Sequence, residues 1–165
     1  MNFLIGQNEY FIVEHSYSCA LPGYLIVSPT IEVTSINELP DTTQVLLGPT
    51  LASATDVVNY TVNPIKIYCA QFGEEDTHLH FHIFPRTREI TTEFLAEFPG
   101  QSELIYGPIF LDWARSKYRG SKKEVWAATS PVIGKMKAHY KEAQRDKTHS
   151  ANHLSTKHSV GRLSS

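Results

Sequence analysis

Three histidines alternate with three apolar residues near the middle of the chain, and this alternation limits what the chain can fold into. The segment reads His78-Leu79-His80-Phe81-His82-Ile83. Successive side chains on a β-strand point to opposite faces, so a period of two predicts a strand over residues 78–84. Its three imidazoles would share one face. The apolar side chains would pack on a core from the other face.

The row of imidazoles has three interpretations. Histidine is a common zinc ligand, but His78 and His82 would lie about 13 Å apart along a strand, so only two neighbours could share one metal ion. Imidazole is also a nucleophile near neutral pH and exchanges protons there. A central His80 could then attack a substrate, while the outer two orient it and bind an anion. The third interpretation is a half-exposed strand whose histidines have no chemical role.

Composition favours one globular domain and excludes several classes of partner. The chain has 165 residues, of which 41% are hydrophobic and 19% are charged, enough for one core and too apolar for a disordered chain. A net charge of −2 gives no basic field for a DNA or RNA polymer or a membrane surface. Cys19 and Cys69 are far apart, and the first residues do not resemble a secretory signal, so we expect a cytoplasmic location without disulfides.

The order of the predicted elements favours an α+β domain with a mostly antiparallel sheet and packed helices. Strands are predicted over residues 10–13, 24–28, 65–72 and 78–84, the last two as a hairpin. Helices are predicted within residues 41–60, 92–98 and 108–118 and from Pro131 onward. Gly48-Pro49 should break or kink the first helix. We divide the chain into a domain over 1–120 and a C-terminal helical extension with a polar tail over 121–165.

The histidine segment resembles the signature of the histidine triad (HIT) family, which is His-x-His-x-His-x-x with apolar x. Pro85-Arg86 directly after it also occurs in many members. Residues 21–29 are similar to a second family strand, although Tyr24 stands where many members have a histidine. The resemblance covers roughly residues 3–90. It implies the HIT fold, usually as a homodimer.

The resemblance also implies a nucleotide hydrolase or transferase that needs neither a cofactor nor a metal site. His80 would attack the α-phosphorus of a nucleoside phosphoramidate or a dinucleoside polyphosphate. His78 and His82 would support His80 and bind the phosphoryl oxygens or the leaving group. Water would then release an AMP-like nucleoside monophosphate from a covalent nucleotidyl-histidine.

Four further residues stand at or near positions that bind the substrate in the family, although not all of them match its residue types. Glu14 would accept hydrogen bonds from the ribose hydroxyls, although a solvated strand end explains this carboxylate equally well. Gly73, Glu75 and Thr77 lie in or after the turn that contacts the substrate phosphate. The family's Gln-Ser/Thr in this turn is replaced by Glu74-Glu75. Two carboxylates near a phosphate are repulsive, so they point away, favour a cationic leaving group or weaken the activity.

Two other functions remain open at this point. A binding module would hold the nucleotide in the same pocket without turning it over, because Glu74-Glu75 prevents productive catalysis. The other alternative is a metal-dependent hydrolase, in which the histidines bind a metal ion. A covalent adduct with labelled substrate separates the enzyme from the binding module, and activity that is insensitive to a chelator excludes the metal.

Overall fold

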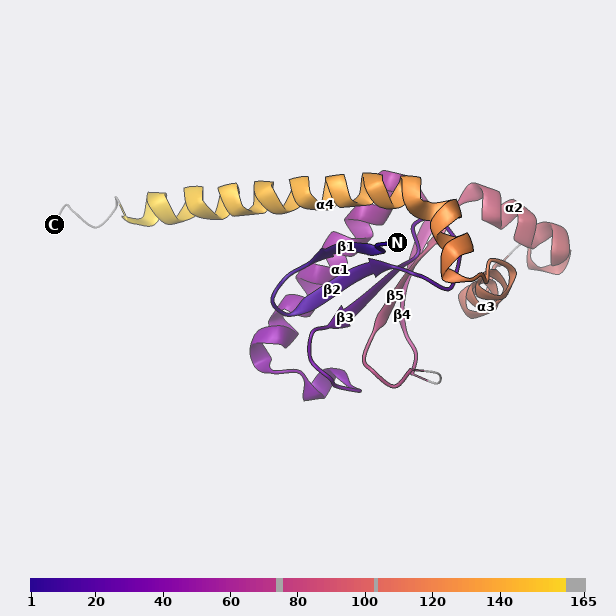
Figure 1. Ribbon diagram of the computed structural model, residues 1–165, viewed down its shortest axis with the longest axis horizontal. Helices are drawn as coiled ribbons and strands as arrows, with labels where there is room; N and C mark the ends of the chain where they lie inside the picture. The colour runs from indigo at the N-terminus through magenta and orange to yellow at the C-terminus, as the bar shows by residue number, and fades with distance from the viewer. Residues whose placement is uncertain (74–75, 103, 160–165) are drawn as a thin grey trace.

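A five-stranded antiparallel sheet forms the centre of the fold in the computed structural model, which describes residues 1–73, 76–102 and 104–159 (Figure 1). The strand order is β1-β2-β3-β5-β4. The strands are β1 (Leu4–Gln7), β2 (Phe11–His15), β3 (Leu25–Pro29), β4 (Lys66–Gln71) and β5 (Phe81–Arg86). The helices are α1 (Asp41–Val62), α2 (Arg88–Glu97), α3 (Gly107–Lys117) and α4 (Lys122–Ser159), with 3-10 turns η1 (Ile36–Glu38) and η2 (Pro99–Gln101). The predicted α+β architecture is confirmed.

Alternating burial along the strands gives the sheet two different faces. One face carries the main core, in which β2, β3 and β5 contribute Phe11, Val13, Leu25, Val27, Phe81 and Ile83. Helices α1 and α4 pack against each other on this face, and their buried apolar side chains complete the core (Figure 1). The intervening positions of the same strands point to the opposite face, where the histidines lie.

A second, aromatic core lies on the side of the sheet where α2 and α3 pack. Tyr24, Phe84, Phe94 and Phe110 are almost completely buried in it. The ring centroid of Phe110 lies 6.1 Å from that of Phe84 and 5.0 Å from that of Phe94, in edge-to-face arrangements. Such pairs add to the stabilisation that burial provides. This core fixes α3 next to β3 and β5.

Two prolines lie inside helices without ending them. Helix α1 continues through Pro49, and α4 begins at Lys122 and continues through Pro131. Of the break or kink expected at Gly48-Pro49, the break does not occur, and the expected helix start at Pro131 is wrong. An internal proline costs about 3 kcal/mol, but helices in proteins are stabilised mainly by packing of an apolar face. Both helices bury such a face in the main core on each side of the proline.

Helix α4 begins close to the boundary that we placed at residue 120. Its Val125, Ile133, Met136 and Tyr140 are buried in the main core, and the helix then continues beyond the sheet (Figure 1). The division of the chain at this boundary stays a prediction. Among the residues described here, no helix combines the length and the apolar character that a membrane crossing requires.

Candidate active site

The three histidines lie at the start of β5, on the sheet face opposite α1 and α4. His82 is in the strand, whereas His78 and His80 belong to the segment that leads into it, because β5 begins at Phe81. The predicted strand over residues 78–84 therefore begins too early. The pairing explains the difference, since Val27 of β3 and Gln71 of β4 both pair with Phe81 and neither neighbouring strand pairs with β5 before it.

The predicted alternation of side chains is confirmed although the strand is shorter. Leu79, Phe81 and Ile83 are 1%, 7% and 0% exposed and belong to the main core. The backbone N–H of Leu79 donates to the carbonyl oxygen of Val33 at 2.7 Å, which holds this segment in place before the strand begins. The three imidazoles consequently face the same pocket.

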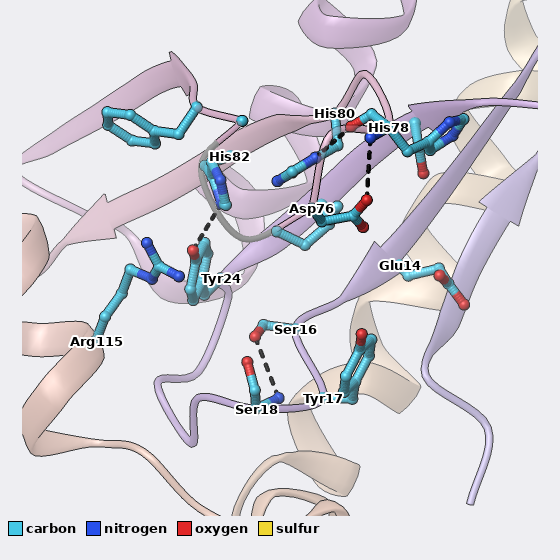
Figure 2. Close-up of a pocket in the computed structure, with 14 residues that line it drawn as sticks. Glu14, Ser16, Tyr17, Ser18, Tyr24, Asp76, His78, His80, His82 and Arg115 are labelled. Atoms are coloured by element: carbon cyan, nitrogen blue, oxygen red, sulfur yellow. Dashed lines mark hydrogen bonds between the residues drawn. The ribbon is translucent and has the colours of Figure 1, made fainter. Parts of the chain in front are cut away.

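This pocket has a volume of about 360 Å³ and combines polar groups from several parts of the chain (Figure 2). Its lining consists of Glu14, Ser16, Tyr17, Ser18, Tyr24, Ile26, Ser28, Phe72, Gly73, Asp76, His78, His80, His82 and Arg115. Strand β3 and the ends of β2 and β4 supply its walls, and α3 supplies Arg115. Clefts with a few convergent polar groups and perturbed pKa values are typical of active sites.

His80 is held as the tautomer that a nucleophile requires. Its Nδ1 lies 2.7 Å from the carbonyl oxygen of His78. A carbonyl can only accept a hydrogen bond, so Nδ1 carries the proton and Nε2 keeps a free lone pair. Figure 2 shows the ring of His80 projecting into the pocket. An imidazole in this tautomer can act as a nucleophile without prior deprotonation.

His82 forms a buried pair with Tyr24. Its Nδ1 lies 2.7 Å from the Tyr24 hydroxyl (Figure 2). Burial, with the neighbouring charges of His80 and Arg115, lowers the pKa of His82 to about 4, and burial raises the pKa of Tyr24. Both groups are therefore neutral at pH 7. Among the described residues the Tyr24 hydroxyl has no other acceptor, so it donates to Nδ1 and leaves the proton of His82 on Nε2.

His78 completes the triad in a different way. Its backbone N–H donates to Oδ1 of Asp76 at 3.0 Å. Its own Nδ1 is buried and has no hydrogen-bond partner within the part of the chain that the structure describes. An unpaired buried polar atom costs about 1–3 kcal/mol. A bound substrate could supply the missing partner.

The predicted substrate-binding residues have different positions. Glu14, on β2, and Gly73, just after β4, line the pocket with the triad. Thr77 is exposed and is not part of the lining. Glu75, like Glu74, lies outside the described residues. Of the three that the structure describes, two therefore lie in the pocket with the histidines.

Several pocket residues, among them Arg115 and Tyr24, were not identified as functional from the sequence. Arg115 comes from α3, beyond the segment that carries the family resemblance. Tyr24 was noted only because it replaces a histidine, and its bond to His82 joins residues that are 58 positions apart. No local pattern could have revealed either contact. Gly23 indicated only that a strand begins near Tyr24, and it did not indicate the contact of Tyr24 with His82.

Hydrogen bonds occupy part of the triad's capacity to bind a metal ion, although Nδ1 of His78 is unpaired among the described residues. The ring centroids of His80 and His82 are 4.7 Å apart, but the Nδ1 atoms of both are already hydrogen-bonded. Only their Nε2 atoms could coordinate. In residues 1–73, 76–102 and 104–159, no three His, Cys, Asp or Glu residues form a group that could hold a metal ion.

The buried neutral histidines predict a loss of stability in acid. His15 is fully buried, its Nδ1 bonded to the carbonyl of Ser16 and its Nε2 accepting from the N–H of Gly23, and burial lowers its pKa as it does for His82. In the unfolded chain both would titrate near pH 6.5. The unfolded state therefore takes up protons first as the pH falls. The free energy of unfolding is highest above pH 6.5 and decreases toward pH 4.

The variant His82→Gln should show a smaller decrease. We expect His82 to account for about 2 kcal/mol of the loss between pH 7 and pH 4.5, at about 1.4 kcal/mol per unit of pKa difference. Urea unfolding of parent and variant at both pH values measures this contribution. Exposed carboxylates titrate in both proteins, so their contribution cancels when the decrease in the variant is subtracted from that in the parent. An equal decrease in the two proteins would show that His82 is not the group responsible.

Comparison with solved structures identifies the fold. A hypothetical histidine triad nucleotide-binding protein from Sulfolobus tokodaii strain 7 matches with a TM-score of 0.60 and 14% identity over 88% of this chain and 87% of that one. A HIT-like protein involved in cell-cycle regulation from Bartonella henselae matches with a TM-score of 0.54 and 17% identity over 84% and 87%. A Zn-bound histidine triad family protein from Mycobacterium smegmatis matches with a TM-score of 0.53 and 14% identity over 90% and 88%.

These matches define the class of fold. The chain adopts the histidine triad fold, as the resemblance of the histidine segment implied. The structural similarity extends well beyond residues 3–90, since each match covers more than four fifths of both chains. No family model matches the sequence, and no curated protein matches it.

Proposed function

We propose that this protein is a nucleotidyl hydrolase or transferase that acts at the α-phosphate of a nucleoside phosphoramidate or a dinucleoside polyphosphate. The observation that carries the proposal is the hydrogen bond from Nδ1 of His80 to the carbonyl of His78. It leaves Nε2 as a lone-pair donor inside a pocket. The fold of a Sulfolobus tokodaii protein described as nucleotide-binding also supports the proposal.

The reaction has two steps. Nε2 of His80 forms a bond to the α-phosphorus, while the bond from phosphorus to the leaving group breaks and the leaving group keeps the electron pair. A phosphate leaves as the anion, whereas the nitrogen of a phosphoramidate takes up a proton from solvent and leaves as the amine. The imidazole becomes cationic, and its Nδ1–H donates a stronger hydrogen bond to the carbonyl of His78. Water then attacks phosphorus, the N–P bond breaks and returns the lone pair to Nε2, and the water's proton passes to solvent. AMP or a similar monophosphate is released.

The other pocket residues would hold the nucleotide during these steps. Nε2–H of His82 would donate to a phosphoryl oxygen, and donors aimed at developing charge usually provide the largest part of such catalysis. The unpaired Nδ1 of His78 would find a partner in the substrate. Glu14, on the other side of the pocket, would accept hydrogen bonds from the ribose.

The variant Tyr24→Phe should lower kcat about tenfold to a hundredfold and change KM little. It keeps the aromatic ring of Tyr24 in the core but removes the hydroxyl that fixes the tautomer of His82. Steady-state kinetics with both substrate types measures the effect. Tyr17→Phe is the matched control, because Tyr17 also lines the pocket and has no hydrogen bond to the triad. Equal activity of the two variants would contradict this role of Tyr24.

Release of AMP with and without a chelator separates this proposal from its alternatives. We expect turnover of diadenosine triphosphate or adenosine 5′-phosphoramidate to continue in EDTA. Binding of AMP without any turnover would favour a nucleotide-binding module. Loss of activity on chelation would favour a metal-dependent hydrolase, the alternative to which the Zn-bound state of the Mycobacterium smegmatis protein points.

A further inference from the structure

Arg115 places an unpaired cation in the triad pocket. It lies in the last turn of α3, and Figure 2 shows its guanidinium beside Tyr24 and His82. Among the described residues, Lys117 pairs with Glu93 and Glu97 and His139 pairs with Asp56, whereas Arg115 forms no ion pair. A half-buried guanidinium without a carboxylate is available for an external anion.

The backbone around Arg115 is held firmly against the pocket. The N–H of Ala20 donates to the carbonyl of Tyr118 at 2.7 Å, and the N–H of Gly120 donates to the carbonyl of Ser18 at 3.1 Å. These bonds tie the end of α3 to the loop between β2 and β3, which itself lines the pocket. Ala114, next to Arg115, is fully buried in the aromatic core. The position of the cation is therefore built into the fold.

The pocket has opposite charges at its two sides. Figure 2 shows Arg115 on one side and Glu14 on the other, with the triad and a second carboxylate, Asp76, between them. Glu14 suits the neutral ribose, whose hydroxyls are hydrogen-bond donors. The positive charge of Arg115 acts on this part of the pocket, because it contributes to the lowered pKa of His82 and opposes the rise that burial causes in the pKa of Tyr24. A nucleotide whose ribose contacts Glu14 would extend the far side of its phosphate toward Arg115.

We propose that Arg115 and His82 form a subsite for a second phosphate, so that the leaving group is anionic. The substrate class is then a nucleoside whose α-phosphate is joined to a further phosphate, rather than a phosphoramidate. This inference rests on the proposed function. When the bond from the α-phosphorus to the bridging oxygen breaks, the electron pair stays on that oxygen. The guanidinium would stabilise this charge with two parallel hydrogen bonds.

Binding of ADP and AMP tests the subsite directly, because ADP carries the second phosphate and AMP does not. Titration calorimetry without divalent cations should show that the parent protein binds ADP about tenfold or more tightly than AMP, as expected for a bidentate charged contact. Arg115→Gln should lose this preference and bind AMP within about threefold of the parent. Arg119→Gln removes the same charge from a residue outside the pocket and should keep the preference.

Two results would overturn the subsite. One is equal binding of ADP and AMP by the parent protein. The other is an equal loss of affinity for ADP and AMP in Arg115→Gln, which would show that Arg115 contacts the α-phosphate or has a structural role. The adduct on His80 is measured separately. If the parent protein prefers ADP through Arg115 but never forms the adduct, the result supports the subsite and contradicts the proposed reaction.

Discussion

Replacing His80 with alanine is expected to abolish turnover and covalent labelling, with a loss on the order of a thousandfold or more. The variant removes the only imidazole of the triad whose Nδ1 is bonded to a backbone carbonyl, and with it the free Nε2. His82 cannot substitute, because its Nε2 carries the proton. Steady-state assays of AMP release measure the effect.

The neighbouring histidines provide matched comparisons. His78→Ala and His82→Ala should each retain a trace of activity, about a hundredfold below the parent, because each removes a supporting hydrogen bond and not the nucleophile. His80→Asn should keep nucleotide binding nearly intact, since its amide can still meet a phosphate oxygen. Turnover of His80→Ala at the parent rate would show that the mechanism is wrong whatever the fold.

Replacing Phe110 with alanine should lower the free energy of unfolding by about 3–5 kcal/mol. Phe110 is fully buried at the centre of the aromatic core and contacts the rings of Phe84, Phe94 and Trp113. Truncation removes this apolar surface from the core and leaves a cavity that packed neighbours fill only in part. Urea denaturation monitored by circular dichroism measures the change.

Ile109→Ala is the control for this variant, because Ile109 is the preceding residue on α3 and is 47% exposed. Ile109→Ala should lower the free energy of unfolding by less than about 1 kcal/mol, as substitutions at exposed positions generally do. A similar small cost for Phe110→Ala would mean that α3 is not fastened through the aromatic core. Because that core positions both Tyr24 and Arg115, Phe110→Ala should also weaken catalysis at temperatures where it remains folded.

The period of two around the histidines was sufficient to predict the centre of the fold. It assigned Leu79, Phe81 and Ile83 to the core and the imidazoles to one face, as observed, and that face lines the pocket. It did not predict where β5 begins, because that depends on how far the neighbouring strands extend. The prolines in α1 and α4 misled for a related reason. The free-energy cost of a proline inside a helix can be predicted from the sequence, whereas the tertiary packing that outweighs this cost cannot.

The pocket was predictable only where a motif or the family resemblance marks its residues. The triad was found from its own motif, and Gly73 and Glu14 from the resemblance. The bond from Tyr24 to His82 and the approach of Arg115 depend on how β3, β5 and α3 pack, so no motif encodes them. The homodimer, the AMP-like ligand and the cytoplasmic location stay predictions.

The mass of the intact protein during turnover tests the central claim most directly. The protein is mixed with diadenosine triphosphate, quenched within milliseconds to seconds under neutral or alkaline conditions that preserve an acid-sensitive N–P bond, and analysed by mass spectrometry. The account predicts an added mass of one adenylyl group, located by peptide mapping on His80 and absent from His80→Ala. Steady release of AMP with no adduct at any time, or an adduct on a residue other than His80, would contradict it.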